Sequence, residues 1–163
     1  MALFHLSVTQ TKRSAGQSAI ASAAYRAGER LYSEYYGEYS DYTRKGGVIC
    51  SDIFLPSHLK SKYPRITLES AIPCETQAIK WSVASRERYY NIAAKCDKET
   101  MLQREYTPDC MDKRNRYMVD HADYILAVWN GCPSGTGNTV RYAHQKSKTI
   151  IVINPVSLDV TRE

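Results

Sequence analysis

The sequence DYILAVWNGCPSGTGNTVRYAHQKSKTIIVINP occupies residues 123–155 and holds the order of elements that decides the fold. The apolar runs at its two ends, DYILAVW and TIIVINP, predict buried strands. Between them, GTGNTVRYAHQKSK predicts a helix that begins directly after a loop of small residues. Strand, helix and strand in this order are typical of a parallel sheet with helical crossovers.

The same alternation extends back to residue 66. ITLESAI (66–72) and ETMLQ (99–103) predict strands. Two helices are expected, one over 73–95 and one over 110–122. Each carries an inward-facing stripe, formed by Trp81, Ser85, Tyr89 and Ile92 in the first helix and by Met111, Met118 and Ala122 in the second. We therefore expect an α/β fold with a mostly parallel sheet.

The first third of the chain has a different composition. Apolar residues alternate from Ala2 to Val8, which predicts a half-buried strand. An alanine-rich amphipathic helix is expected over 17–34, followed by a tyrosine-rich loop, YYGEYSDYTRKGG (35–47), and a strand, VICSDIFLP (48–56).

Bulk properties limit the classes of function. A chain of 163 residues with 43% hydrophobic content suits one compact domain. No stretch is apolar enough for a bilayer span or a signal peptide, so we expect a cytoplasmic protein. The five cysteines and four histidines are scattered, and their spacing predicts neither disulfides nor a metal site. A net charge of +5 favours anionic partners without naming one.

The loop WNGCPSGTGNT admits two interpretations. It follows a strand of a parallel sheet and precedes a helix, where free N–H groups and the helix dipole favour a phosphate. Its glycines allow close approach and its hydroxyls add donors. Alternatively, the same residues make a tight turn with a serine or threonine cap. The spacing alone leaves both interpretations open.

A second element points to the same edge of the sheet. The helix before strand 123–129 carries RNRYMVDHAD, which places Arg114 or Arg116 near the loop. An arginine on a helix is more often solvated, and Asp120 is an alternative partner on the same helix. The residues expected to bind the anion are Arg114, Arg116, Pro133, Ser134, Gly135, Thr136, Gly137, Asn138 and Thr139.

Three segments, AIPCETQAIKW, KRNRYMVDHAD and AVWNGCPSGTGNTVRYA, resemble the YpsA-like branch of the SLOG superfamily over about residues 62–155. This resemblance implies a Rossmann-like three-layer sandwich that binds a nucleotide or nucleotide derivative, with NAD, ADP-ribose or a nucleoside phosphate as the ligand. In related phosphoribohydrolases an arginine–lysine pair and a loop glutamate cleave a nucleoside monophosphate. Here Arg114 matches the arginine, whereas Asn115 stands in the place of the lysine and Arg141 in that of the glutamate. The departure argues against nucleoside-phosphate hydrolysis and leaves a binding role.

Residues 1–56 resemble the start of MobA/MobL plasmid-mobilisation relaxases, because the first strand, the SAGQSA turn, the AAYRAGE helix and the YTRKGG loop occur in order. In that family a tyrosine attacks a DNA phosphodiester with help from a metal held by histidines, and Tyr25 occupies the matching position. The histidine cluster has no counterpart here, so Tyr25 is an orphan nucleophile, and a packed or surface aromatic residue is the favoured interpretation. The resemblance implies binding of single-stranded DNA, in which the clustered tyrosines stack on exposed bases and the backbone is contacted by Lys12, Arg13, Arg26, Arg30, Arg44 and Lys45. The alternative, which the residue types alone favour, is a solvated basic and aromatic loop region.

Two partial resemblances predict two units: a relaxase-like fragment over 1–58 and a partial SLOG domain over 62–163. The SLOG branch begins with a strand, loop, helix and strand that residues 60–66 do not supply. We therefore hypothesise that the strand from Ala2 to Val8 and its helix complete the sheet, since an open sheet edge invites association. A homodimer is the alternative way to cover that edge. The leading functional hypothesis is nucleotide sensing, and the second is a DNA-processing role in plasmid mobilisation.

Overall fold

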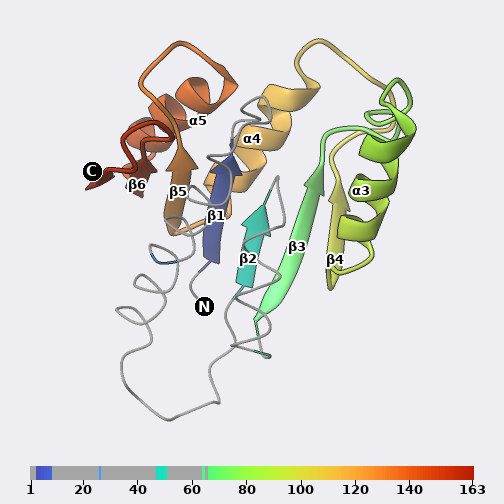
Figure 1. Ribbon diagram of the computed structural model, residues 1–163, viewed down its shortest axis with the longest axis horizontal. Helices are drawn as coiled ribbons and strands as arrows, with labels where there is room; N and C mark the ends of the chain where they lie inside the picture. The colour runs from blue at the N-terminus through green and yellow to red at the C-terminus, as the bar shows by residue number, and fades with distance from the viewer. Residues whose placement is uncertain (1–2, 9–25, 27–46, 51–63, 65) are drawn as a thin grey trace.

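The computed structural model describes residues 3–8, 26, 47–50, 64 and 66–163 of the chain. The described elements form an α/β fold built on one sheet (Figure 1). Its strands are β1 (Leu3–Val8), β2 (Gly47–Cys50), β3 (Thr67–Ile72), β4 (Lys98–Met101), β5 (Tyr124–Val128), β6 (Thr149–Ile153) and β7 (Val160–Arg162). The described helices are α3 (Val83–Ala93), α4 (Cys110–Asp120) and α5 (Gly135–Gln145).

The strands lie in the order β4-β3-β2-β1-β5-β6-β7. All neighbouring pairs are parallel except β6 with β7, which is antiparallel. The first strand of the chain lies inside the sheet, with Phe4 paired to Val48 on one side and to Tyr124 on the other. The hypothesis that the N-terminal strand completes the sheet is therefore confirmed for β1.

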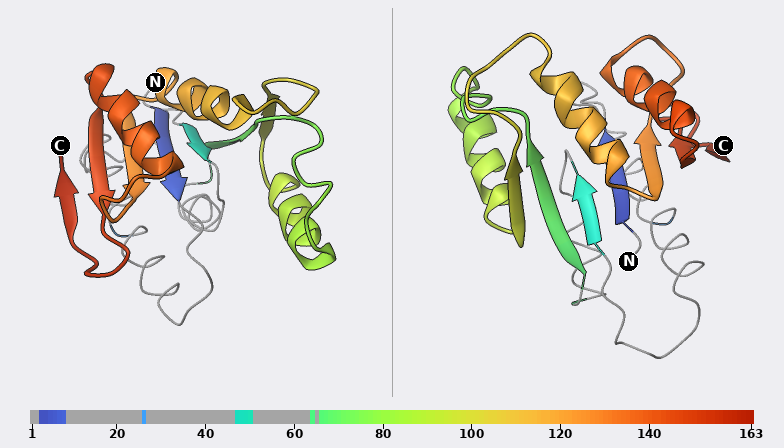
Figure 2. Two further views of the ribbon diagram at one scale, coloured as in Figure 1. Left: turned by 90° about the horizontal axis from the view of Figure 1, so that it is seen from above. Right: turned by 180° about the vertical axis from the view of Figure 1, so that it is seen from behind.

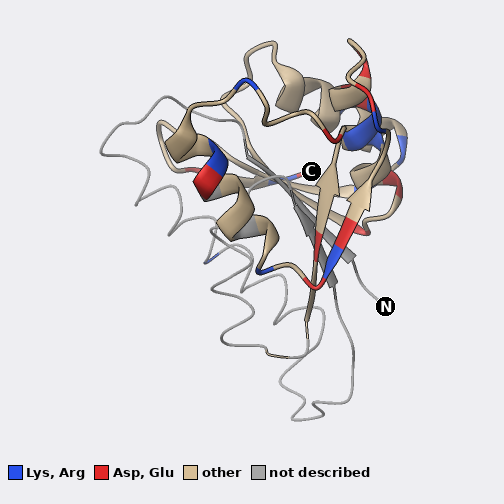
Figure 3. Ribbon diagram, turned by 90° about the vertical axis from the view of Figure 1, so that its right-hand side faces the viewer, with Lys and Arg blue, Asp and Glu red and all other residues tan. Residues whose placement is uncertain are grey.

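The handedness of the crossover connections determines on which face of the sheet each helix lies. The chain moves outward from β3 to β4 through α3, then returns across the sheet to β5 through α4 and continues in that direction to β6 through α5. Since such crossovers are right-handed, α3 must lie on one face and α4 and α5 on the other. Figure 2 and the edge-on view in Figure 3 show this arrangement. The expected Rossmann-like fold with a mostly parallel sheet is confirmed.

The core lies between the sheet and the pair α4 and α5. Ile125 and Ala127 of β5 pack with Val119 of α4 and with Val140 and Ala143 of α5, all of them buried. The neighbouring residues of β5, Leu126 and Val128, are also buried. A strand buried on both faces explains why this segment reads as a continuous apolar run rather than as an alternation.

Three sequence predictions were wrong in detail. The helix expected over 73–95 begins at Val83, and residues 75–80 form turns, so Trp81 lies before the helix and is 38% exposed. Met111, expected to face inward, is also 38% exposed. Strand β7 was not predicted. The predicted helix over 17–34, the tyrosine-rich loop up to residue 46 and residues 51–56 lie outside the described residues, except for Arg26, which is helical and exposed.

Candidate functional site

The loop after β5 is held by its own backbone and side chains. The indole Nε1–H of Trp129 donates to the carbonyl oxygen of Cys132 at 2.7 Å, and the N–H of Cys132 donates to Asn130 Oδ1 at 3.1 Å. Gly131 takes a φ of +85°, a left-handed conformation that favours glycine. These contacts close a tight loop that delivers the chain to the start of α5.

Ser134 caps α5, as the second interpretation of this loop expected. Its Oγ accepts the N–H of Gly137 at 3.1 Å, and its carbonyl oxygen accepts the N–H of Asn138 at 3.0 Å. The cap therefore satisfies one of the four N-terminal amides that have no acceptor within the helix, and the bond to Asn138 is the first regular bond of the helix. The helix itself offers no acceptor to the amides of residues 135 and 136, and its dipole places partial positive charge at this end.

The residues of the loop divide into a solvent side and a core side. Pro133, Gly135 and Asn138 are exposed, and Ser134 is half-buried. Thr136, Gly137 and Thr139 are buried. The hydroxyl of Thr139 donates to the carbonyl oxygen of Gly135 at 2.9 Å, so it is directed to the helix backbone. A role for this hydroxyl in ligand binding stays a prediction, and the local geometry favours a structural role.

The two glycines of the loop have different surroundings. A Cβ added at Gly137 would lie 3.1 Å from Cζ2 of Trp129 and 3.3 Å from the carbonyl oxygen of Cys132. Glycine lets the helix pack closely against the indole ring there, and a methyl group would require Trp129 or the loop to shift by a few tenths of an ångström. At Gly135 an added Cβ would meet nothing within 4 Å. The position that a side chain at Gly135 would occupy is therefore open.

Arg114 lies one turn into α4 and is half-buried. Its Nε donates to Oδ1 of Asn115 at 2.8 Å. Asn115, which the sequence resemblance matched to a lysine position, thus orients the guanidinium of its neighbour. Helices α4 and α5 both begin at the end of the sheet where the parallel strands finish (Figure 1), and they pack against each other. Convergence of Arg114 with the 133–139 loop on one anion stays a prediction.

Arg116 is engaged between the helices. Its Nε lies 2.6 Å from Oδ2 of Asp112, and its guanidinium carbon lies 4.6 Å from the ring centroid of Tyr142 in α5. Tyr142 in turn donates its hydroxyl to Asp120, which also pairs with Lys146 at 3.1 Å. Since Tyr142 lies about two helical turns from Gly135, this cluster fastens α4 to α5 at a distance from the loop. A binding role for Arg116 stays a prediction.

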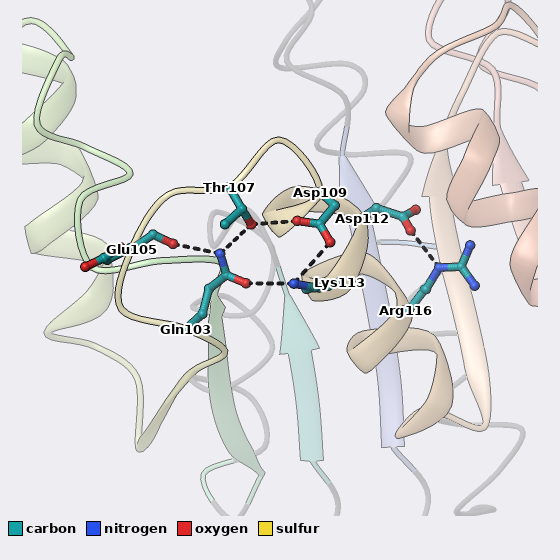
Figure 4. Close-up of polar contacts among 7 residues, drawn as sticks. All are labelled: Gln103, Glu105, Thr107, Asp109, Asp112, Lys113 and Arg116. Carbon is teal, nitrogen blue, oxygen red and sulfur yellow. Dashed lines mark hydrogen bonds and ion pairs between the residues drawn. The ribbon is translucent and has the colours of Figure 1, made fainter.

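A polar network at the β4–α4 connection escaped the sequence analysis (Figure 4). Gln103 donates to Thr107 Oγ1 at 2.7 Å, and the Thr107 hydroxyl donates to Asp109 Oδ1 at 2.6 Å. Lys113 of α4 contacts both Asp109 and Gln103. The hydrogen bond from Thr107 and the pairing with Lys113 hold the pKa of Asp109 below its usual range. The network fixes the loop that leads into α4, and it therefore helps to set the position of Arg114 in the first turns of that helix.

Glu69 is a buried carboxylate that the sequence analysis read only as part of a strand. It is 7% exposed and accepts hydrogen bonds from Thr100 at 2.6 Å and from Tyr117 at 2.8 Å, while Lys98 lies 3.1 Å away. Burial alone would raise the pKa of Glu69, but the three partners outweigh it and lower the pKa. In the sequence, only the presence of a charged residue within a predicted strand indicates a buried carboxylate here. Its partners come from β4 and α4 and lie 29 to 48 residues away along the sequence.

Metal binding and membrane insertion can be assessed for the described residues alone. In the part of the chain that the structure describes, no group of three or more His, Cys, Asp or Glu side chains could hold a metal ion. Within the same residues, no helix is long and apolar enough to cross a membrane. Tyr25, the candidate nucleophile, lies outside the described residues, as do Lys12, Arg13, Arg30, Arg44 and Lys45.

The family model for the MobA/MobL family matches residues 17–107, which is more than half of the chain. The chain belongs to the MobA/MobL family. The match begins ahead of β2 and extends through β3, α3 and β4 into the β4–α4 connection. It therefore covers one side of the sheet, whereas β5, α5 and β6 lie beyond it.

Individual relatives of this MobA/MobL chain have two kinds of name. The mobilization protein MobL of Acidithiobacillus ferridurans is 54% identical over 56 residues, and the probable mobilization protein MobA of Bifidobacterium longum is 36% identical over 63 residues. An uncharacterized SPbeta prophage-derived protein, YoqJ of Bacillus subtilis, is 35% identical over 97 residues. These matches cover 34%, 39% and 52% of this chain. They cover only 15%, 11% and 57% of the respective relatives.

Proposed function

We propose that this chain acts in DNA mobilisation as a DNA-binding member of the MobA/MobL family. The family match over residues 17–107 carries the proposal, and two relatives bear the name of mobilisation proteins. A net charge of +5 suits contact with a phosphate backbone. Arg26, exposed on a helix within the matched segment, is a described candidate for such a contact.

Fluorescence anisotropy with a labelled single-stranded oligonucleotide tests this proposal. We expect binding that weakens as salt rises, because displaced counterions drive association with about 0.7 logarithmic units of slope per phosphate contact. Arg26→Ala is expected to lower that slope by about one contact. Arg162→Ala, which removes an equal charge at the exposed β7, is the matched control and keeps the slope. Absence of salt-dependent binding by the folded chain would contradict the proposal.

Strand cleavage is a further proposal for the same role. A tyrosine phenol can accept a phosphoryl group from DNA and conserve the energy of the bond. Nicking of a single-stranded substrate in the presence of a divalent metal ion would support this activity. If nicking persisted in Tyr25→Phe, this tyrosine would not be the nucleophile.

A second candidate function is the binding of a nucleotide or nucleotide derivative at the start of α5. The observation that favours it is the open space in front of Gly135, at a helix N-terminus that follows β5. In the strand order, β1 and β5 are neighbours from which the chain proceeds in opposite directions, and ligands of open α/β sheets collect at such a point. NAD, ADP-ribose and nucleoside phosphates are the ligands to try, with Arg114 as the cation.

Calorimetric titration with these compounds separates the second function from the first. Gly135→Ala is expected to abolish binding without loss of stability, because the new methyl group occupies only the open space. Arg114→Ala is expected to weaken binding of every phosphate ligand. Release of free base during incubation, lost in Arg114→Ala, would indicate hydrolysis as well. No response to any of the compounds from the folded chain would contradict a nucleotide site.

A further inference from the structure

Three aromatic side chains meet at helix α3, which lies beside β4 at one end of the sheet (Figure 1). We call Trp81, Tyr89 and Tyr90 the Tyr89 cluster. Trp81 and Tyr90 both pack edge to face against Tyr89, with 5.7 and 5.2 Å between the ring centroids and 82° and 61° between the ring planes. Trp81 is 38% exposed and Tyr90 is 62% exposed. The half-buried ring of Tyr89 thus supports two rings that reach solvent.

The backbone around Trp81 holds the cluster in place. The N–H of Trp81 donates to the carbonyl oxygen of Ala78 at 3.0 Å, and Ala78 is buried. Directly after Trp81, the Oγ of Ser82 accepts the N–H of Ser85 at 3.3 Å and caps α3. The edge-to-face contacts with Tyr89 add to this order. Because the rings are already fixed, a ligand that stacks on them does not have to order the side chains first.

Basic residues flank the Tyr89 cluster. Lys80 directly precedes Trp81 and is exposed, and Arg86 lies four residues before Tyr90 on α3, which places the two side chains next to each other. Neither cation forms an ion pair with the residues that the structure describes. Between positions 79 and 91 the sequence has three basic residues and a single acidic one, Glu87. The surroundings of the rings therefore favour an anionic ligand.

We propose that the Tyr89 cluster stacks on unpaired bases of single-stranded DNA, with Lys80 and Arg86 beside the phosphates. This inference rests on the proposed DNA-binding function and gives it a contact surface. Helix α3 lies within residues 17–107, the part of the chain that the family model matches. Every base has a π-face, so exposed aromatic rings bind single strands without a sequence preference, and neighbouring cations contact the backbone.

The charges beside the rings favour DNA over a protein partner. The centre of a protein interface is depleted in lysine, because an ammonium group without a partner is costly to bury. A phosphate supplies that partner for Lys80 while the bases cover Trp81 and Tyr90. The bases of a duplex are stacked on one another and cannot reach the rings. We therefore expect single strands to bind more tightly than a duplex of the same length.

Tryptophan emission reports on contact with Trp81. The chain has two tryptophans, and Trp129 is engaged in the loop before α5 by Cys132 and Gly137. We expect an oligothymidine of about 12 nucleotides to quench the emission of the full chain, because a thymine stacks on the exposed indole. Trp81→Phe should lose the quenching and keep most of the affinity measured by anisotropy, since a phenyl ring still stacks.

Alanine variants identify the rings that bind. Trp81→Ala and Tyr90→Ala should each weaken the binding of the oligothymidine by about tenfold, which is the scale for loss of one stacked base. Their salt dependence should remain that of the wild type, because no cation is removed. Tyr90→Phe should keep the affinity. Tyr106→Ala is the matched control and should bind like the wild type, because Tyr106 is also 62% exposed and lies outside the cluster.

The outcomes separate this inference from the function on which it rests. No binding of single-stranded DNA by the folded wild type would overturn both. Salt-dependent binding without quenching, unchanged in Trp81→Ala and Tyr90→Ala, would overturn the stacking surface alone. Equal affinity for a duplex, or equal weakening by Tyr106→Ala, would overturn it as well. A DNA-free dimer in sedimentation equilibrium that Trp81→Ala dissociates would assign the surface to a second copy of the chain instead. Circular dichroism checks that each variant is folded.

Discussion

Gly135 and Gly137 lie two residues apart and have opposite roles. Gly137 touches the indole of Trp129, whereas Gly135 faces open space. The sequence analysis treated both as sites of close approach to a ligand. A sequence alone does not show which neighbouring atoms lie close to a glycine. The structure assigns that requirement at Gly137 to the protein's own tryptophan.

Alanine at each of these positions should therefore affect stability differently. Gly137→Ala is expected to lower the free energy of unfolding by about 1–3 kcal/mol, because its methyl group overlaps Trp129 and Cys132. Gly135→Ala is expected to leave it unchanged or raise it by about 0.5 kcal/mol through the entropy of the unfolded chain. Urea unfolding of the two variants measures the difference, and equal effects would contradict the packing described here.

Glu69 predicts a pH dependence of stability. Its pKa in the folded protein lies below its ordinary value of about 4.3, so the folded state binds the proton more weakly than the unfolded state. Its contribution is therefore present above that value and is lost as the pH falls through the folded pKa. Glu69→Gln is expected to cost about 1–3 kcal/mol at pH 7 and less at pH 3. Urea unfolding at both pH values measures this, with the exposed Glu105→Gln as control; a cost that does not shrink in acid would contradict it.

At the scale of elements, periodicity predicted the long, buried segments and missed those fixed by local capping. Strands β3, β5 and β6 and helices α4 and α5 lie where the apolar pattern placed them. Helix α3 begins late because Ser82 caps it: its Oγ accepts the N–H of Ser85, and its carbonyl oxygen accepts the N–H of Arg86. Because residues that favour helices precede Ser82, the sequence analysis began the helix before this capping residue.

The sequence contains no apolar pattern that predicts strand β7. It has three residues, all exposed, so it carries no apolar alternation. What positions it is a turn in which Asn154 Oδ1 accepts the N–H groups of Val156 and Ser157, with Leu158 at a φ of +64°. Antiparallel pairing with β6 then follows from the tight connection.

The cap of α5 gives a prediction at this scale. Ser134→Ala removes the acceptor of the Gly137 N–H and is expected to lower the free energy of unfolding by about 1 kcal/mol. Ser134→Asp should keep most of that stability, since a carboxylate also caps a helix and suits the positive end of its dipole. Thermal or urea unfolding checks the pair. Similar losses in the two variants would show that the cap is not the source of the effect.

For the whole molecule, the two stretches that differ in composition share one sheet. β1 and β2 lie between β3 and β5 in the sheet. Residues 66–163 alone would therefore leave one edge of β3 and one edge of β5 without a neighbouring strand. The division into units over 1–58 and 62–163 stays a prediction. The sequence could suggest that β1 joins the sheet, but not where, because the pairing of strands more than 100 residues apart leaves no local pattern.

A fragment of residues 62–163 tests that division. We expect it to lack the cooperative unfolding transition of the full chain, because β3 and β5 would each expose an edge that β1 and β2 now cover. Circular dichroism during urea unfolding distinguishes the two behaviours, with the full chain as control. A sharp transition in the fragment would show that it is an independent domain.

The central position of β1 also bears on synthesis of the protein. Of its two neighbours, β5 is translated more than 110 residues after β1. At roughly 5–20 residues per second, β1 waits about 6–23 seconds for that neighbour. During this interval β1 lacks one of its two neighbouring strands, and an unpaired strand edge is prone to association with other chains.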